Sequence, residues 1–101
     1  MQYKILQFKD IKKVNYAFMD YDYAVKHGFK LSDYVEVYAG DIRVDRKDKI
    51  FNTLDDIFTK FNIDRPEDFQ GHSLSVSDLI QVEDALYYVD CVGFQQVEVK
   101  E

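Results

Sequence analysis

The chain has 101 residues and a formal net charge of −6, with 47% hydrophobic and 16% aromatic residues. This composition excludes wholesale disorder, and the length suits a single domain over residues 1–101. No apolar run is long enough to cross a bilayer, and no signal or lipidation motif is present, so we expect a cytoplasmic protein. Cys91 is the only cysteine, so no internal disulfide can form.

The first half of the chain predicts two strands around a short helix. Residues 3–8 carry apolar side chains at both alternating sets of positions, which predicts a strand buried on both faces. A helix is expected between Asp20 and Gly28, because Asp20 can cap its start and Gly28 can supply a left-handed exit. Residues 34–38 alternate again and predict a strand that ends near Gly40.

The clearest predicted helix spans residues 54–61. Thr53 is expected as its N-cap, with Asp55 and Asp56 in the first turn. Its apolar positions follow the spacing i, i+3, i+4, i+7 and are Leu54, Ile57, Phe58 and Phe61. Such a stripe predicts that one side of the helix packs on a sheet.

The last third of the chain predicts three strands. Residues 79–83 and 86–92 form an expected hairpin joined at Glu83-Asp84-Ala85, and residues 94–99 form a third β-rich run. The order of the elements predicts an α+β fold, a small antiparallel sheet with two short helices packed on one face.

Charge is unevenly spread along the chain. Residues 53–90 carry nine acids against two bases, whereas residues 1–52 carry eight acids against ten bases. Proteins that bind nucleic acid directly gain most of their affinity by neutralising phosphates, so we expect no direct nucleic-acid partner. The basic cluster of Arg43, Arg46, Lys47 and Lys49 is interrupted by Asp45 and Asp48, which favours a solvated segment. The acidic half therefore faces either water or a basic protein surface.

Residue types that support catalysis are present, but not in a catalytic pattern. We expect no metal and no cofactor, since His27, His72 and Cys91 lack paired ligand spacing and no glycine-rich phosphate loop occurs. Asp20 and Asp22 are explained by helix capping. The alternation from Ser73 to Ser77 predicts Leu74 and Val76 inside, the serines outside, and Ser77-Asp78 in local turn bonds. Cys91 is expected in the core.

Several strings resemble the small YodL-like domains encoded by plasmids, integrative elements and phages of Gram-positive bacteria. The matching stretches are residues 18–24, 38–42, 54–58 with Phe61-Asn62, 65–66, 71–78, 88–90 and 93–94. The string Gly-His-Ser-Leu-Ser-Val-Ser-Asp at 71–78 is the most specific of them. Such domains often carry a glycine in the hairpin turn, where this chain has Glu83-Asp84-Ala85. The family supplies no catalytic motif to carry over.

The setting of such domains on mobile DNA implies an inhibitor of host defence, and in size and character the chain also resembles anti-CRISPR proteins that act on the type II RNA-guided nuclease. The leading hypothesis is a non-catalytic protein that binds this nuclease and hinders guide RNA or DNA loading. Its expected contact residues are Asp55, Asp56, Glu67, Asp68, Glu83 and Asp84, with Tyr87 as an aromatic anchor. The alternatives are a DNA mimic against restriction enzymes, a regulatory binding module, and a metal-dependent nuclease built on Asp20, Asp22 and His72.

Overall fold

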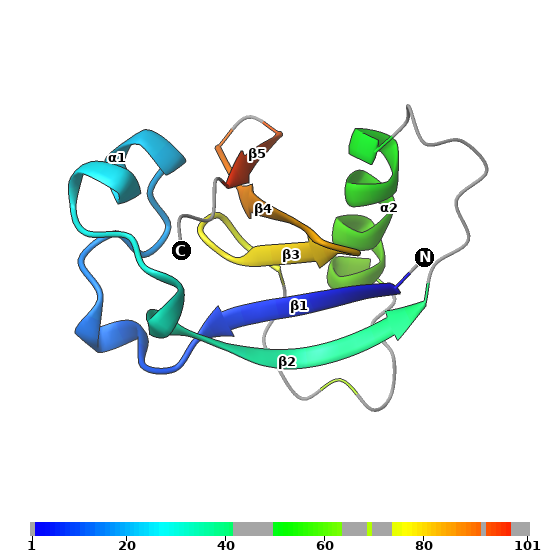
Figure 1. Cartoon of the computed structure of the whole chain (residues 1–101), viewed down its shortest axis with the longest axis horizontal. Helices are drawn as coiled ribbons and strands as arrows, with labels where there is room; N and C mark the ends of the chain where they lie inside the picture. Colours follow the sequence, from blue (N-terminus) through cyan, green and yellow to red (C-terminus); the bar gives the residue numbers. More distant parts are fainter. Residues whose placement is uncertain (1, 42–49, 64–68, 70–73, 92, 98–101) are drawn as a thin grey trace.

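The computed structural model describes residues 2–41, 50–63, 69, 74–91 and 93–97. Its elements are β1 (Gln2–Phe8), a 3-10 turn at Ile11–Lys13, α1 (Tyr21–Lys26), a 3-10 turn at Leu31–Asp33, β2 (Tyr34–Asp41), α2 (Ile50–Ile63), β3 (Leu79–Val82), β4 (Ala85–Val89) and β5 (Phe94–Val97). The strands form a five-stranded antiparallel sheet in the order β2-β1-β3-β4-β5 (Figure 1). The predicted α+β class is confirmed.

Strand β1 lies inside the sheet, next to the edge strand β2, and pairs with β2 on one side and β3 on the other. Its register with β2 shifts between Ile5 and Leu6, which gives β2 one extra residue and a local bulge. Tyr3 lies opposite Gly40, where an added Cβ would approach the tyrosine hydroxyl to 2.9 Å. The glycine therefore leaves room for the Tyr3 ring beside β2.

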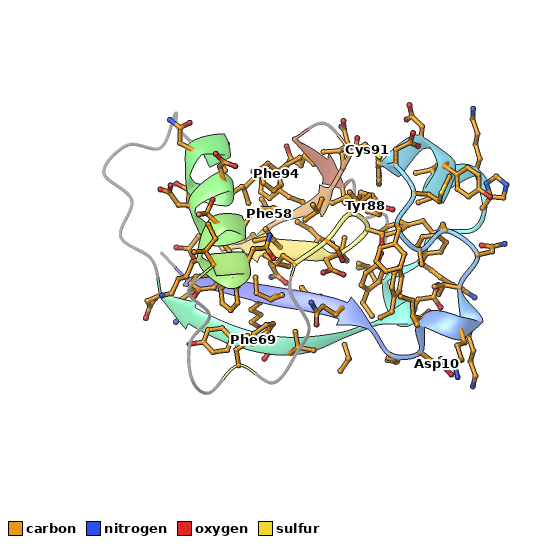
Figure 2. The ribbon with its side chains drawn as sticks, turned by 180° about the vertical axis from the view of Figure 1, so that it is seen from behind. Asp10, Phe58, Phe69, Tyr88, Cys91 and Phe94 are labelled. Atoms are coloured by element: carbon orange, nitrogen blue, oxygen red, sulfur yellow. The ribbon has the colours of Figure 1, made fainter. Side chains whose placement is uncertain are left out.

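One face of the sheet packs against α2. Leu54, Ile57 and Phe61 of this helix are fully buried, and they share a cluster with residues of β1, β3 and β4. Phe58 is partly buried and meets the ring of Phe94 on β5 at 6.3 Å, edge to face (Figure 2). The predicted stripe is therefore confirmed, and burial of each such side chain stabilises the fold by roughly 1.5–3 kcal/mol.

Helix α2 begins earlier than the sequence suggested. Its first residue is Ile50, so Thr53 lies inside the helix, only 6% exposed, and the prediction of Thr53 as N-cap is wrong. The reason is that the apolar stripe starts at Ile50, which packs against the cluster and precedes Leu54 by one turn. Within the described residues, neither α2 nor any other helix has the length and apolarity needed to cross a membrane.

The opposite face of the sheet is covered by the segment between β1 and β2, residues 9–33, which we call the α1 lobe. Tyr16 and Ala24 of this lobe are buried in a second cluster with Leu79 and Tyr88 of the sheet. The prediction that both helices pack on one face is therefore wrong. Because β1, β3 and β4 carry apolar side chains on both faces, the sheet needs a cover on each side.

The ends of α1 follow the sequence prediction. Asp20 is the N-cap, and its side chain accepts a hydrogen bond from the Tyr23 amide. His27 is the C-cap, and Gly28 follows with φ +89°, a left-handed conformation that glycine adopts without strain. Local capping chemistry therefore sets both ends of this six-residue helix.

The predicted hairpin is also present, with a turn of two residues. Glu83 and Asp84 form the turn, and Ala85 already belongs to β4. Glu83 has φ +53°, a conformation that glycine, asparagine and aspartate adopt more readily than glutamate. The turn therefore holds some backbone strain at Glu83.

Candidate functional site

Two of the predicted contact residues, Asp55 and Asp56, are exposed on the surface of α2. Because the helix begins at Ile50, both lie in its second turn and not in the predicted first turn. The favourable effect of the helix dipole on carboxylates is confined to the first turn. These two charges therefore contribute little to the helix and are free for another role.

Two further predicted contact residues, Glu83 and Asp84, are exposed at the β3–β4 turn. The Glu83 amide donates to the Gln2 carbonyl oxygen at 2.9 Å, and the Gln81 side-chain amide donates to the Glu83 carbonyl oxygen at 3.1 Å. These bonds use the backbone of the turn, and they anchor it to β1 and to β3. The two side-chain carboxylates take no part in them.

These four carboxylates belong to two neighbouring parts of the fold, α2 and the turn between β3 and β4. Helix α2 lies across the end of the sheet where β3 turns into β4 (Figure 1), and Leu54 and Val82 share one core cluster. Among the described residues, the ion pair is Lys4 Nζ to Glu36 Oε1 at 3.3 Å, and none forms at this end. We define the acidic surface as Asp55, Asp56, Glu83 and Asp84.

The three remaining predicted contact residues are not part of an exposed surface that the structure describes. Glu67 and Asp68 lie outside the described residues. Tyr87 is only 6% exposed and belongs to the cluster under α2, so the prediction of a surface aromatic anchor is wrong. Its strand, β4, is covered on both faces, so its alternation gave no sign of which side chains remain accessible.

The residues considered for metal-dependent chemistry do not form a site within the described chain. Asp20 Oδ1 accepts the Tyr23 amide at 2.8 Å as the α1 cap, and Asp22 lies in the first turn of the same helix. His72 and Ser73 lie outside the described residues. In the part that the structure describes, no group of three or more His, Cys, Asp or Glu side chains is placed to hold a metal ion.

Ser77 is buried, only 1% exposed, so the prediction that it points outward is wrong. Its φ of +83° turns it inward, and its hydroxyl oxygen accepts the Phe18 amide at 2.9 Å. The Ser77 carbonyl oxygen accepts the Tyr34 hydroxyl at 2.6 Å. Ser77 thus ties the α1 lobe and β2 to the start of β3.

Asp78 is a buried carboxylate beside Ser77, 1% exposed. Its Oδ2 accepts the Gln7 side-chain amide at 3.1 Å and the Ser75 backbone amide at 3.0 Å. The second of these is the local turn bond predicted for Ser77-Asp78, and the first joins β3 to β1 over a long sequence distance. A buried carboxylate needs such donors, because an unsatisfied one would be costly.

Three tyrosine hydroxyls complete the polar contacts on the α1 side of the sheet. Tyr16 donates to Asp33 Oδ2 at 2.8 Å, and Tyr88 donates to the Met19 carbonyl oxygen at 2.7 Å. Burial raises the pKa of Tyr16, Tyr34 and Tyr88 above the ordinary tyrosine value, and the hydrogen bond to Asp33 raises that of Tyr16 further. These hydroxyls therefore stay protonated and act as fixed donors.

Two exposed side chains were not anticipated. Cys91 is exposed in the β4–β5 connection, so its predicted core position is wrong (Figure 2). Phe18 is 57% exposed with φ +65°, a strained conformation for an aromatic residue. A local sequence pattern reveals neither feature. The conformation of Phe18 depends on its bond to Ser77, and the exposure of Cys91 depends on the turn after β4.

A comparison with the models of known protein families shows to which family the chain belongs. The family model of the YodL-like domain matches residues 2–99. The chain belongs to the YodL-like domain family. No curated protein and no solved structure matches it. The match spans every element described above, so both core clusters and the acidic surface belong to the YodL-like domain.

In this YodL-like domain, the end of the string at 71–78 has a structural explanation. Leu74 is 3% exposed under α2, and Ser77 and Asp78 make the long-range bonds that join β1, β2, β3 and the α1 lobe. A fold that depends on these bonds restricts the residue types at these positions. The described end of this string, residues 74–78, therefore lies at a junction of the fold, away from the exposed charges of the acidic surface.

Proposed function

We propose that this YodL-like domain is a non-catalytic inhibitor, encoded by a mobile genetic element and acting in the cytoplasm. It binds a host defence protein, the type II CRISPR RNA-guided nuclease, and hinders the loading of guide RNA or DNA. The observation that carries the proposal is the acidic surface, whose carboxylates are exposed and form no ion pair within the described residues. Such a nuclease holds nucleic acid in a positively charged channel, which this surface complements.

The energetics favour the acidic surface as the contact. Its carboxylates lose no internal partner of the described chain when a cation approaches, so binding does not first break an ion pair. Charge complementarity acts mainly on the rate of encounter, and salt screens it over about 8 Å at physiological ionic strength. The association rate constant of the protein and the nuclease should therefore be high at low salt and fall as the salt concentration rises.

Two double variants test the surface. Asp55→Asn with Asp56→Asn and Glu83→Gln with Asp84→Asn each remove two charges and leave the described hydrogen bonds in place. We expect each to weaken binding to the guide-free nuclease by about two- to tenfold, mainly through slower association. The measurement is binding kinetics at two salt concentrations.

A matched control separates this surface from the general negative charge. Asp22→Asn with Glu36→Gln removes the same number of charges from α1 and β2, away from the acidic surface. Binding close to that of the unchanged protein is expected for this variant. If the control weakens binding as much as the two test variants do, the partner senses net charge and the proposed surface is wrong.

The partner itself is tested by capture from a host lysate followed by mass spectrometry. Recovery of the RNA-guided nuclease, lost with the combined four-residue charge variant, is the expected result. Recovery of a restriction enzyme in its place would favour a DNA mimic. Recovery of an enzyme encoded beside the domain would favour a regulatory binding module.

We further propose that the domain is not an enzyme. The use of Asp20 as the α1 cap supports this, because its Oδ1 already accepts the Tyr23 amide and the cap explains the residue without a metal. We expect no nuclease activity of the purified protein with added Mg²⁺ or Mn²⁺. An activity abolished by Asp20→Asn, in a variant that remains folded, would contradict the proposal.

A further inference from the structure

A polar pocket of about 380 Å³ lies in the α1 lobe, on the other side of the molecule's sheet from α2. Its lining includes three lysines and a histidine, together with Tyr16 and Asp33. The basic side chains are those of Lys12, Lys13, Lys30 and His27. The basic character is notable because the whole chain has a net charge of −6.

Local structure holds the basic groups around this pocket. Asp10 caps the 3-10 turn at Ile11–Lys13 by accepting the Lys12 amide at 3.0 Å, and this places Lys12 and Lys13 at the end of the turn (Figure 2 labels Asp10). Lys30 follows the chain reversal at Gly28, which has φ +89°. The pocket thus gathers cations from two segments that the fold brings together.

The His27 ring is held in a defined orientation at the rim. It stacks on Tyr23 with ring centroids 3.8 Å apart and an angle of 10°, and its Nδ1 lies 2.9 Å from the Tyr23 carbonyl oxygen. The Nδ1 therefore carries the hydrogen of that bond. This leaves Nε2, on the other side of the ring, for a ligand.

The charges of this pocket are not balanced within the described chain. Asp33 is the carboxylate in the lining, and it accepts the Tyr16 hydroxyl at 2.8 Å. Among the described residues, Lys12, Lys13 and Lys30 form no ion pair. Three lysines against one carboxylate leave a formal charge of about +2, which a phosphate monoester of about −1.5 to −2 matches.

We propose that this pocket binds a phosphate monoester group. The lysine ammonium groups act as donors to the phosphate oxygens, and the matched charge favours this dianion over a singly charged carboxylate. The group can belong to a small phosphorylated molecule or to the terminal phosphate of an oligonucleotide. The proposal does not depend on the inhibitor function, because the acidic surface and this pocket share no residue.

Amide chemical shifts of isotopically labelled protein, measured at low ionic strength and neutral pH, test the proposal with phenyl phosphate as the probe. We expect saturable shifts at residues 12–16 and 27–30. Lys12→Gln with Lys30→Gln should weaken binding by about tenfold or more. Lys4→Gln with Lys60→Gln changes the net charge equally on β1 and α2, and it should alter the affinity by less than about twofold.

Three results would overturn the proposal. These are shifts spread over lysines outside the pocket, equal weakening by both double variants, or a dissociation constant weaker than about 10 mM. A short oligonucleotide with a 5′-phosphate, compared with the same oligonucleotide ending in a hydroxyl, distinguishes the two sources of the group. Binding that depends on the phosphate supports an oligonucleotide end, and binding of phenyl phosphate alone supports a small molecule.

Discussion

The two faces of the sheet are covered in different ways. On one face, α2 buries an apolar stripe in which Leu54, Ile57 and Phe61 are at most 1% exposed. On the other face, the α1 lobe packs aromatic rings, and hydroxyl bonds come from Tyr16 of the lobe and from Tyr34 and Tyr88 of the sheet. The first cover depends on shape and apolar burial, and the second also depends on hydrogen bonds between distant parts of the chain.

This difference has a consequence for function. Helix α2 needs only its inner side for stability, so its outer side is free to carry Asp55 and Asp56. The α1 lobe is only six residues of helix and two 3-10 turns, held by specific polar contacts, and these same turns shape the basic pocket. The molecule therefore carries Asp55 and Asp56 on one cover of the sheet and the basic pocket in the other cover.

The largest expected effect tests the apolar cover. Phe61→Ala should lower the free energy of unfolding by about 3–5 kcal/mol, because the side chain is fully buried and its removal leaves a cavity. Ile63→Ala on the same helix is the control, since Ile63 is 80% exposed and should change stability by less than about 0.5 kcal/mol. Chemical denaturation measures both, and equal effects would contradict the described orientation of α2.

The next effect tests the junction at the start of β3. Asp78→Asn should lower the free energy of unfolding by about 2–3 kcal/mol, because a neutral amide oxygen accepts the two bonds of Oδ2 more weakly than the charged carboxylate does. Asp84→Asn, at the exposed hairpin turn, makes the same chemical change at a surface position and should be nearly neutral. A small loss for Asp78→Asn would mean that the junction does not hold β1 and β3 together.

Alkaline pH tests the hydroxyl bonds on the α1 side. The folded pKa values of Tyr16, Tyr34 and Tyr88 are raised above 10, so the unfolded chain loses these protons first. Their stabilising contribution is complete below pH 10 and is lost as the pH rises toward the folded pKa, by up to about 1.4 kcal/mol per tyrosine per pH unit. Denaturation between pH 9 and pH 11 measures the slope.

A variant isolates one of these tyrosines. Tyr34→Phe should make the alkaline slope shallower, because one titrating group is removed, and should also lower stability at neutral pH by about 1–3 kcal/mol, because the Ser77 carbonyl oxygen loses its donor. An unchanged slope would show that the Tyr34 hydroxyl titrates with its ordinary pKa in the folded protein.

The sequence revealed the local features of both covers and missed the long-range ones. The α1 cap at Asp20, the exit at Gly28 and the stripe on α2 depend on neighbours in the chain, so their patterns were sufficient. The burial of Ser77 and Tyr87 depends on segments far away in sequence. The pattern of residues 3–8 predicted a strand buried on both faces, but it did not show that the α1 lobe supplies the second cover, because that cover is a contact between distant segments.

For the candidate site, the sequence was informative where exposure follows from local position. Asp55 and Asp56 lie opposite the apolar stripe, and Glu83 and Asp84 lie in a tight turn, so all four are exposed as expected. The lysines of the pocket lie on two separate turns, and only the fold shows that they meet. The distribution of charge along the chain therefore predicted the acidic surface, but it gave no sign of the basic pocket.

The smallest expected effect concerns the hairpin turn of the acidic surface. Glu83→Gly should raise the free energy of unfolding by less than about 1 kcal/mol, because relief of the strain at φ +53° is partly offset by the greater entropy of glycine in the unfolded chain. Glu83→Ala is the control, since it removes the same charge and keeps the strain. Equal stability of the two variants would show that the turn is not strained.

The most direct measurement compares binding of the protein to the RNA-guided nuclease with and without its guide RNA. If the acidic surface occupies the basic channel, the guide-free nuclease binds the protein tightly and the guide-loaded nuclease binds it at least about tenfold more weakly. The variant lacking the charges of Asp55, Asp56, Glu83 and Asp84 should lose most of this preference. Equal affinity for both forms, unchanged by the variant, would contradict the proposed function.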